Sequence, residues 1–309
     1  MRLAELKNNF DYVAMVANKI FMWNKDRVVE IEAEIEDLRV MVDNPVVIDK
    51  TSFGIIQKMG NVSFEVKDNK LCCVNQLGKY FAPILDLYVP NVDWLNIEGK
   101  GITFINKDVK RISKCCAKKD SCSAFNGVIF YENGTILATD RFKGQAIDFK
   151  YEENLKAWSI PVEFFDYLPD SKCGIILTDT YAVYKSMGYQ VCTRLYNSEI
   201  PNVLKVIASC LGKGFKTDWE RLPEYSLCPT DYVNIKIVDN GITLDFADND
   251  NNVLFTTTKQ FDDSGYSFNG WLPYDRLGFL GGEVYFDKPE RPITCKENNI
   301  STFVMQLRR

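Results

Sequence analysis

Hydrophobic and polar residues alternate in six segments of the chain, and a short polar turn divides each segment in two. Period-two alternation on both sides of an Asn, Asp or Gly turn predicts two antiparallel strands joined as a hairpin. The copies recur about every 50 residues, an interval at which internal repeats define architecture. The three clearest copies are "NVSFEVKDNKLCCVN" (61–75), "NGVIFYENGTILATD" (126–140) and "YVNIKIVDNGITLDF" (232–246). The other three lie at 26–42, 174–191 and 283–307.

Segments compatible with helices precede these hairpins. Helices followed by antiparallel strands, in repetition, predict an α+β fold. If the six modules are paired, the chain divides into three similar domains, at 1–98, 99–207 and 208–309. The longest helical candidate is 3–19, in which helical spacing is kept by Leu3, Leu6, Phe10, Val13 and Ala17. The shorter candidates lie at 50–59, 106–119, 160–169, 200–212 and 272–282.

Length and composition are sufficient for several packed cores. The chain has 309 residues, of which 46% are hydrophobic. No apolar run approaches the roughly 18 residues that a membrane span needs. The charged start, "MRLAELKNNF", is unlike a secretory signal. We therefore expect a cytoplasmic protein.

Ten cysteines raise the question of disulfides or a metal site. Two adjacent pairs, Cys72–Cys73 and Cys115–Cys116, argue against an ordered disulfide framework, and most other cysteines lie in apolar runs. Reduced thiols fit this pattern better. The alternative is a zinc site with Cys115, Cys116 and Cys122 as ligands, although the chain has no histidine and these cysteines lack CxxC spacing.

Motifs for catalysis are absent from the sequence. Without histidine, the chain lacks Ser-His and Cys-His pairs and the commonest general base. The segment "LGKGFKT" (211–217) does not have phosphate-loop spacing, and no GxGxxG occurs. The densest acidic run alternates with apolar residues, which predicts a solvated face of a strand rather than an acid–base pair. Its acids are Glu30, Glu32, Glu34 and Glu36. We expect neither an enzyme nor a cofactor.

Cations gather in the helical candidate "NKDVKRISKCCAKK" (106–119). Helical spacing puts most of them on a face apart from the apolar residues Val109, Ile112 and Cys116. Because the whole chain has a net charge of −5, such a patch suits a polyanion and favours nucleic-acid binding. A solvated helix face is the other interpretation. The candidate DNA-binding residues are Lys107, Lys110, Arg111, Lys114, Lys118 and Lys119.

Several segments, in the same order, resemble the bacterial DNA polymerase III β subunit, the sliding clamp. "FNGVIFYENGTILATDRFKGQAIDF" (125–149) is similar to the family's "LNG…L…ATDGHRLA" stretch. "WSIPVEFFDYLPD" (158–170) and "EIPNVLKVI" (199–207) are similar to the two segments that follow it in the family. The resemblance also covers 47–94 and the C-terminal "STFVMQLRR".

The resemblance implies an α+β DNA clamp fold, with three similar domains that each contain two helix-plus-strand modules. Members of the family close as head-to-tail homodimeric rings around duplex DNA and tether the replicative polymerase, without chemistry of their own. The implied partners are double-stranded DNA of any sequence, DNA polymerase, the clamp loader and a second copy of the chain, but no membrane. The chain is shorter than usual members, which fits a phage or mobile-element clamp. The alternatives are a clamp-derived scaffold that does not encircle DNA, and a carboxylate-dependent hydrolase.

Partner peptides of this family bind a cleft between the middle and C-terminal domains. Where the family has Gly-His-Arg-Leu, this chain has Arg141-Phe142-Lys143-Gly144, so we expect altered selectivity or a lost cleft. Core packing is the alternative role for the apolar members of the site. The implied cleft residues are Phe125, Thr139, Phe142, Lys143, Gly144, Pro201, Lys205, Val206, Met305, Gln306, Leu307 and Arg308.

Overall fold

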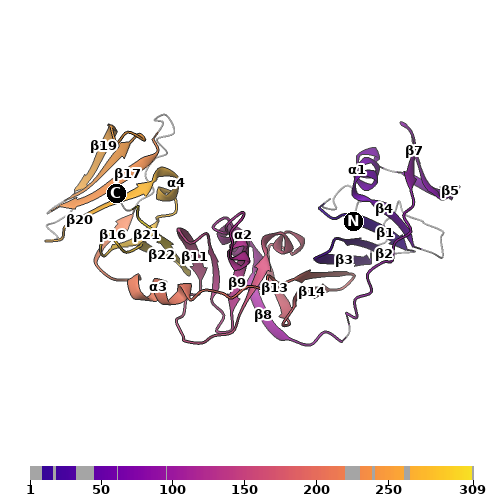
Figure 1. Ribbon diagram of the computed structural model, residues 1–309, viewed down its shortest axis with the longest axis horizontal. Helices are drawn as coiled ribbons and strands as arrows, with labels where there is room; N and C mark the ends of the chain where they lie inside the picture. The colour runs from indigo at the N-terminus through magenta and orange to yellow at the C-terminus, as the bar shows by residue number, and fades with distance from the viewer. Residues whose placement is uncertain are drawn as a thin grey trace. The chain divides into compact units, whose positions relative to one another are not determined.

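The computed structural model describes residues 9–16, 19–32, 45–60, 62–94, 96–219, 230–238, 241–260 and 265–307. The chain divides into two compact units, each formed from two stretches of sequence. Unit 1 contains Met1–Phe104 and Asp166–Leu195, and unit 2 contains Ile105–Phe165 and Tyr196–Arg309. Each unit is built around its own eight-stranded sheet (Figure 1). No helix in these described ranges is long and apolar enough to cross a membrane.

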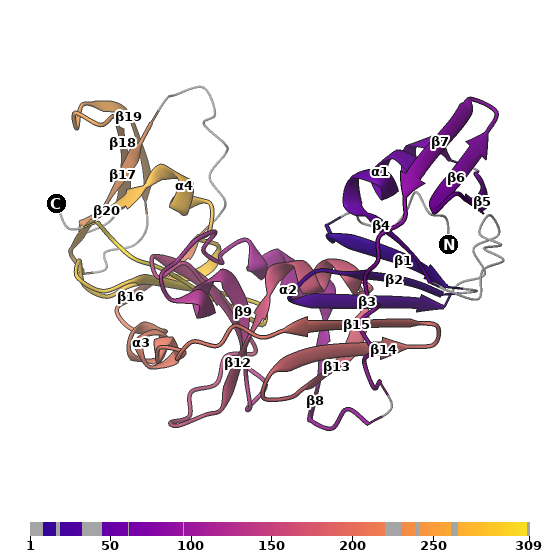
Figure 2. The same cartoon turned by 45° about the vertical axis from the view of Figure 1, so that its right-hand side comes forward.

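The large sheet of unit 1 joins strands from both of its stretches of sequence (Figure 2). Its strands are β1 (Tyr12–Val16), β2 (Lys19–Trp23), β3 (Arg27–Glu32), β4 (Val46–Asp49), β8 (Lys100–Ile105), β13 (Lys172–Leu177), β14 (Tyr181–Ser186) and β15 (Tyr189–Arg194). They lie in the order β4-β1-β2-β3-β15-β14-β13-β8. The two stretches meet where β3 pairs with β15, and there Val29 and Val191 are opposite each other and fully buried. Apolar cross-strand pairs of this kind stabilise a sheet.

Helix α1 (Lys50–Met59) is the helix that the sequence predicts at the same residues. It begins after Asp49, whose carboxylate accepts a hydrogen bond from the backbone amide of Ser52 (2.8 Å), as an N-cap residue does. Phe53 and Ile56 are buried and lie three residues apart, on the face that contacts β4 and β1. The amphipathic spacing therefore identifies this helix correctly.

A three-stranded sheet completes unit 1. It contains β5 (Ser63–Lys67), β6 (Lys70–Asn75) and β7 (Gly78–Pro83), in that order. Asp68 and Asn69 join β5 to β6 with positive φ angles, as a two-residue hairpin turn requires. The hairpin predicted at 61–75 is confirmed within its described residues.

The large sheet of unit 2 is likewise assembled from distant segments. Its strands are β9 (Gly127–Tyr131), β10 (Ile136–Thr139), β11 (Lys143–Ile147), β12 (Ala157–Pro161), β16 (Phe215–Trp219), β21 (Gly282–Phe286), β22 (Ile293–Glu297) and β23 (Ile300–Val304). Their order is β12-β9-β10-β11-β23-β22-β21-β16. The pairing of β11 with β23 joins the two stretches of sequence, with Gly144 opposite Phe303. The hairpin predicted at 126–140 is confirmed as β9 and β10.

A four-stranded sheet packs within unit 2. It contains β17 (Tyr232–Val238), β18 (Gly241–Ala247), β19 (Val253–Gln260) and β20 (Phe268–Pro273), in the order β19-β18-β17-β20. One apolar cluster joins it to β21–β23, and the rings of Phe268 and Phe286 lie 5.2 Å apart in this cluster. The strands predicted at 232–246 are confirmed as β17 and β18.

Short helices connect several of the strands. They are α2 (Asn106–Ser113), α3 (Val203–Cys210), α4 (Tyr274–Leu277) and two 3₁₀ helices, Ser123–Asn126 and Val162–Tyr167. Leu204 and Ile207 of α3 are buried in a cluster with Leu137 and Phe303 from the sheet. Helices α2, α3 and α4 are shorter than the helices predicted at 106–119, 200–212 and 272–282. The helix predicted at 160–169 is only a 3₁₀ helix, and the one at Ser123–Asn126 was not predicted.

The helix predicted at 3–19 is wrong where the structure describes it. Residues Tyr12–Val16 form strand β1, which pairs with a neighbour on each side: Val13 lies opposite Met22 of β2 and Ile48 of β4. A segment with two sheet partners satisfies its backbone hydrogen bonds as a strand, which overrides a helical spacing of apolar residues. Residues 1–8 and 17–18 of that prediction lie outside the described residues.

The acidic strand face predicted from 28–40 is covered at Glu30. Glu30 is only 5% exposed, and its carboxylate accepts hydrogen bonds from the ammonium of Lys19 (2.7 Å) and from the indole nitrogen of Trp94. Hydrogen bonds to Glu30 and Glu32 raise the pKa of Lys19. The expectation of a solvated face is therefore wrong at Glu30, because the segment that carries Trp94 lies over this side of the sheet. Glu34 and Glu36 lie outside the described residues.

The two compact units divide the stretch that the sequence assigns to a middle domain. Strands β8 and β13–β15 belong to the sheet of unit 1, whereas β9–β12 belong to the sheet of unit 2. Strand pairing crosses the expected boundary near residue 98, where β3 pairs with β15, and the one near residue 207, where β11 pairs with β23. Each compact unit therefore contains one whole large sheet. The three-domain division stays a prediction.

Candidate nucleic-acid interface and partner cleft

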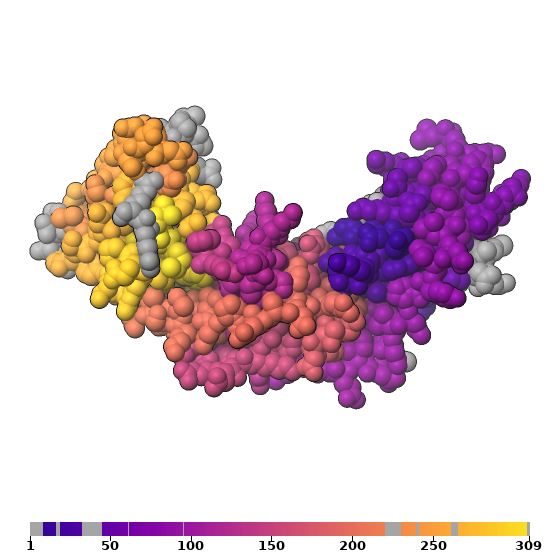
Figure 3. Space-filling view, in the orientation of Figure 1, coloured from indigo at the N-terminus to yellow at the C-terminus, as the bar shows by residue number. Residues whose placement is uncertain are grey.

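Helix α2 carries the first of the residues predicted to bind DNA. It begins at Asn106, whose side-chain amide donates a hydrogen bond to the carbonyl of Phe165 (2.9 Å). Val109 and Ile112 are fully buried against β9–β11, which leaves Lys107 exposed on the opposite side. In Figure 3 this magenta part of the chain lies at the surface of unit 2, beside the yellow C-terminal strands.

The helix ends earlier than predicted, so the last two lysines of the patch are not helical. The backbone amides of Cys115 and Cys116 donate to carbonyls three residues earlier (2.8 and 3.0 Å), which is turn rather than α-helix geometry. Cys115 is fully buried, and this burial raises the pKa of its thiol to about 12. Lys118 and Lys119 are exposed in the turns that follow. The prediction that the helix continues to residue 119 and carries Lys118 is therefore wrong.

The zinc alternative finds no support in the same region. Among the residues that the structure describes, no three Cys, Asp or Glu side chains are grouped as metal ligands. The thiol of Cys116 approaches the carbonyl of Gly127 (3.2 Å), and that of Cys122 approaches the carbonyl of Glu199 (3.5 Å). The two sulfur atoms are thus engaged with different parts of the backbone.

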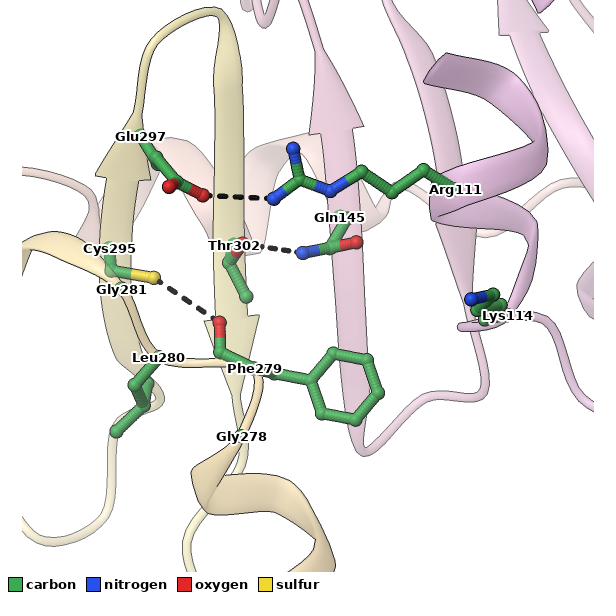
Figure 4. Close-up of a pocket in the computed structure, with 10 residues that line it drawn as sticks. All are labelled: Arg111, Lys114, Gln145, Gly278, Phe279, Leu280, Gly281, Cys295, Glu297 and Thr302. Carbon is green, nitrogen blue, oxygen red and sulfur yellow. Dashed lines mark hydrogen bonds and ion pairs between the residues drawn. The ribbon is translucent and has the colours of Figure 1, made fainter. Parts of the chain in front are cut away.

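A pocket of about 140 Å³ lies between α2 and the strands β11, β22 and β23 (Figure 4). Across it, the guanidinium of Arg111 forms an ion pair with the carboxylate of Glu297 (2.9 Å). The side-chain amide of Gln145 donates to the hydroxyl of Thr302 (3.2 Å) on the floor. The sequence interpretation missed this pocket, because its residues come from four separate segments. They are Arg111, Lys114, Gln145, Gly278, Phe279, Leu280, Gly281, Cys295, Glu297 and Thr302.

The turn between β10 and β11 forms the centre of the predicted peptide cleft. Asp140 holds the turn, since its carboxylate accepts hydrogen bonds from the backbone amides of Phe142 (3.0 Å) and Lys143 (2.8 Å). Thr139 is fully buried, and its hydroxyl donates to the carbonyl of Lys143 (2.8 Å). Phe142 is 55% exposed at the tip. An aromatic ring held outward on a fixed turn is a suitable contact for a partner.

Three cation–π contacts surround this turn. Arg141 lies over the ring of Phe125 (5.1 Å from Cζ to the centroid), and Lys143 lies over the ring of Phe279 (5.0 Å from Nζ). Arg276 of α4 lies over Phe142 (5.1 Å from Cζ). Each contact adds modest attraction at a partly exposed site and fixes the orientation of a ring. Arg276 and Phe279 have no motif around them, so sequence reasoning missed both.

The C-terminal segment passes beside the same turn. The backbone amide of Met305 donates to the carbonyl of Phe142 (2.7 Å), and Arg276 donates to the carbonyl of Met305 (3.4 Å). Leu307 bridges to Trp271 of β20 (2.8 Å). Met305 and Leu307 are half-buried, whereas Arg308 lies outside the described residues.

Gln306 has a structural role in this segment. Its side-chain amide donates to the carbonyls of Lys288 (2.9 Å) and Arg291 (2.7 Å), and these bonds fix the C-terminal segment to the turn after β21. The oxygen of this amide lies so close to Gly270 that a Cβ atom there would collide with it. Both contacts point to packing rather than to a cleft wall.

The remaining cleft candidates lie on and beside α3. Lys205 and Val206 are exposed, and Asn202 caps the helix by accepting a hydrogen bond from the amide of Lys205 (3.1 Å). Phe125 is buried in the cluster that holds Leu204 of the same helix. Pro201 is exposed just before the helix. The structure thus groups four of the candidates around one turn: Thr139, Phe142, Lys143 and Met305. Val206 is exposed on α3, whose buried side packs in the cluster that contains Phe125.

Comparison with known proteins defines the class of fold. No protein-family model matches the sequence, and no curated protein matches it either. Solved structures do match over nearly the whole chain, and they share the DNA clamp fold. This confirms the α+β clamp fold expected from the sequence.

The matching structures are bacterial DNA polymerase III β sliding clamps. The Helicobacter pylori β clamp bound to a DNA ligase peptide has a TM-score of 0.74 at 15% identity, with 97% of this chain and 92% of that chain covered. A putative β subunit from Eubacterium rectale ATCC 33656 has a TM-score of 0.73 at 14% identity, with 96% and 91% covered. The Pseudomonas aeruginosa DnaN clamp bound to griselimycin has a TM-score of 0.73 at 13% identity, with 99% and 94% covered. The fold is thus alike at sequence identities of only 13–15%.

Proposed function

We propose that this chain is a DNA sliding clamp, a cytoplasmic processivity factor that closes as a head-to-tail homodimeric ring around duplex DNA. The observation that carries the proposal is the agreement of fold with β clamps over 97% of this chain and 92% of the Helicobacter pylori clamp. High coverage of both chains supports the proposal that this chain has the full set of clamp modules. In the proposed ring each of the two copies contributes three domains, divided near residues 98 and 207.

Two sheet edges support a ring closed by strand pairing. In unit 2, β19 is an edge strand with exposed Val253 and Leu254, whereas the other edge, β20, is bridged by Leu307. In unit 1, the three-stranded sheet has β5 and β7 at its edges, and the more exposed apolar side chain is Phe81 of β7 (51%, against 40% for Val66 of β5). Exposed apolar edges invite pairing with another chain. We infer that β19 of one copy pairs with β7 of the next, and a heterologous contact of this kind closes when its rotation permits.

The basic residues on and after α2 are the proposed contacts with DNA. Phosphate contacts hold a protein on DNA without reading sequence, so a ring that uses them can slide. A polymerase bound to such a ring has a high effective concentration at the primer end. The proposal therefore needs no catalytic residue and no cofactor.

The proposed site for polymerase and clamp-loader peptides is the surface around Phe142, Met305 and Val206. The Helicobacter pylori clamp was solved with a DNA ligase peptide, which supports peptide binding as the mode of partner recognition. Here the exposed ring of Phe142 and the cation Arg276 favour a peptide with apolar anchors and an acidic group.

Retention on DNA of different topology tests the proposal. The full chain is loaded with its clamp loader onto nicked circular plasmid, moved into high salt and separated by gel filtration. We expect it to co-elute with circular plasmid and to be lost when the plasmid is linearised, and we expect light scattering to give a dimer. A monomer that is not retained on the circle would contradict the proposal and favour the clamp-derived scaffold.

A further inference from the structure

The pocket beside α2 contains more cationic charge than its one ion pair uses. Arg111 and Lys114 both line it, and Glu297 is its one acidic lining residue. In the described part of the chain, Lys114 forms no ion pair. Figure 4 shows Lys114 across the space from Gln145 and the ring of Phe279. The pocket therefore has a net positive charge and room for a second anion.

The Arg111–Glu297 ion pair is of a kind that a stronger anion displaces. The two side chains are 45% and 41% exposed, and exposed pairs of this type contribute little stability. A phosphodiester presents oxygens that a guanidinium binds in the same fork geometry as a carboxylate. The Glu297 carboxylate thus marks the position at which a phosphate oxygen would meet Arg111.

The floor of the pocket is a built polar surface. Gln145 and Thr302 are 8% and 3% exposed, respectively, and lie opposite each other across β11 and β23. The amide nitrogen of Gln145 is fixed by the Thr302 hydroxyl. The volume of about 140 Å³ resembles that of an engineered cavity that admits benzene, so a phosphate group fits.

We propose that this pocket is a subsite for one backbone phosphate of DNA, held by Arg111 and Lys114, and that Glu297 is its resident counter-anion. The inference rests on the proposed function, since it names one phosphate contact of a DNA-binding surface. In the absence of DNA, Glu297 neutralises Arg111. A phosphate must displace the carboxylate before it can bind, so Glu297 keeps this contact from forming in most encounters, weakens the grip on DNA and favours sliding over tight binding.

The test compares two substitutions that each remove one negative charge. Glu297→Gln removes the counter-anion, and Glu283→Gln is the matched control. Glu283 forms an ion pair with Lys216 in the same unit, and its side chain is 43% exposed, against 41% for Glu297. Binding of the full chain to a short linear duplex is measured by fluorescence anisotropy between about 50 and 200 mM salt. For Glu297→Gln we expect tighter binding and a log–log salt slope steeper by about 0.9, the value for one further phosphate contact. For Glu283→Gln we expect an unchanged slope.

A double substitution shows whether Glu297 acts through Arg111. In an Arg111→Gln background, Glu297→Gln is expected to leave the salt slope unchanged. Equal slopes for Glu297→Gln and Glu283→Gln, or a full effect without Arg111, would overturn the proposal. Inorganic phosphate and chloride are compared at equal ionic strength to separate the two sources of phosphate. We expect phosphate to weaken DNA binding more than chloride does, and only where Arg111 is present. Free phosphate that binds the pocket but leaves the affinity for DNA unchanged would show a simple anion site and contradict a DNA subsite.

The result of the anisotropy experiment can be interpreted separately from the result of the retention experiment that tests the ring. The anisotropy experiment uses linear DNA and needs no closed ring, whereas the retention experiment depends on topology alone. Loss of retention together with a steeper slope for Glu297→Gln would contradict the clamp and leave the phosphate subsite standing.

Discussion

The ring of Phe303 occupies the space in which a side chain at Gly144 would begin. The two residues lie opposite each other where β11 pairs with β23, and a Cβ atom at Gly144 would approach the ring more closely than real Cβ contacts do. Glycine at this position thus leaves room for the Phe303 ring. The departure from the family's leucine at this position is compensated within the sheet itself.

Gly144→Ala is expected to destabilise the protein by about 1–3 kcal/mol, because the extra methyl overpacks the contact with Phe303. The measurement is the free energy of unfolding in urea. Gly278→Ala is the control, since a Cβ atom there meets nothing within 4 Å and the φ angle of −65° suits any residue. Equal stability of the two variants would show that Phe303 moves aside without cost.

Leu254→Lys is expected to convert the proposed dimer into a monomer, because it places a charge on the exposed apolar edge β19. Light scattering over a range of protein concentrations measures the change. Val238→Lys is the matched control: Val238 belongs to the same sheet and is 56% exposed, against 46% for Leu254, but lies at the end of an inner strand. A dimer that survives Leu254→Lys would place the interface elsewhere.

Lys107→Glu and Lys118→Glu are each expected to weaken retention on DNA and to reduce the log–log salt slope by about 0.9 per lost phosphate contact. Both side chains are exposed, one on α2 and one in the following turns. Lys150→Glu makes the same charge change at an exposed site of the same unit and serves as the control. The assignment fails if all three variants behave alike.

Met305→Ala is expected to lower the affinity for partner peptides by about 1–2 kcal/mol, the loss typical of an anchoring contact. Two probes are titrated: a C-terminal peptide of the replicative polymerase from the same source, and the DNA ligase peptide of the Helicobacter pylori complex. Because Phe142 replaces a histidine, we expect the first to bind more tightly. Met187→Ala, at a fully exposed methionine of unit 1, is the control. If neither peptide binds, or Met305→Ala has no effect, the cleft is vestigial.

Asp245 is expected to make stability depend on acid pH. Burial would raise the pKa of its carboxyl, but hydrogen bonds from Lys236 (2.7 Å) and Thr256 (2.8 Å) outweigh this and hold the pKa below its usual value of 3.8. A carboxyl whose pKa is lower in the folded state stabilises the protein above the unfolded pKa, and this contribution is lost as the pH falls through the folded pKa.

The corresponding variant is Asp245→Asn. We expect it to cost about 1–3 kcal/mol near neutral pH, and the difference from wild type should shrink below a pH of about 4. Urea unfolding across this range measures it, with the exposed Asp250→Asn as the control. A difference that stays constant with pH would show that the ionised form of Asp245 is not what stabilises the fold.

Local patterns predicted the elements whose structure is decided locally. Helix α1 follows the capping residue Asp49 and has apolar residues at helical spacing. The β5–β6 turn has Asp68 and Asn69, residue types that tolerate the positive φ angles found there. Both signals can be read from the sequence. Strand β1 could not be recognised in this way, because its state depends on pairing with both β2 and β4. Glu30 was misjudged for a similar reason: Trp94, which covers it, is 64 residues away.

The candidate site shows the same division. Phe142 and Met305 were found through motif resemblance, and the structure brings them within one hydrogen bond. Arg276, Phe279 and Glu297 carry no local signal, since only folding places them near α2 and the β10–β11 turn. Charge alone could not show that Arg111 already has a partner.

The pairings of β3 with β15 and of β11 with β23 have a consequence for the nascent chain. While the ribosome has released only the first 165 residues, β3 has no β15 beside it, and the edge at Val29 stays open until residues 189–194 emerge. For β11 the wait lasts until residues 300–304 emerge. Such distant pairing slows folding and leaves strands open to aggregation. Fragments cut near residues 98 or 207 would keep these open edges permanently, so the protein is best expressed, and studied, as the whole chain.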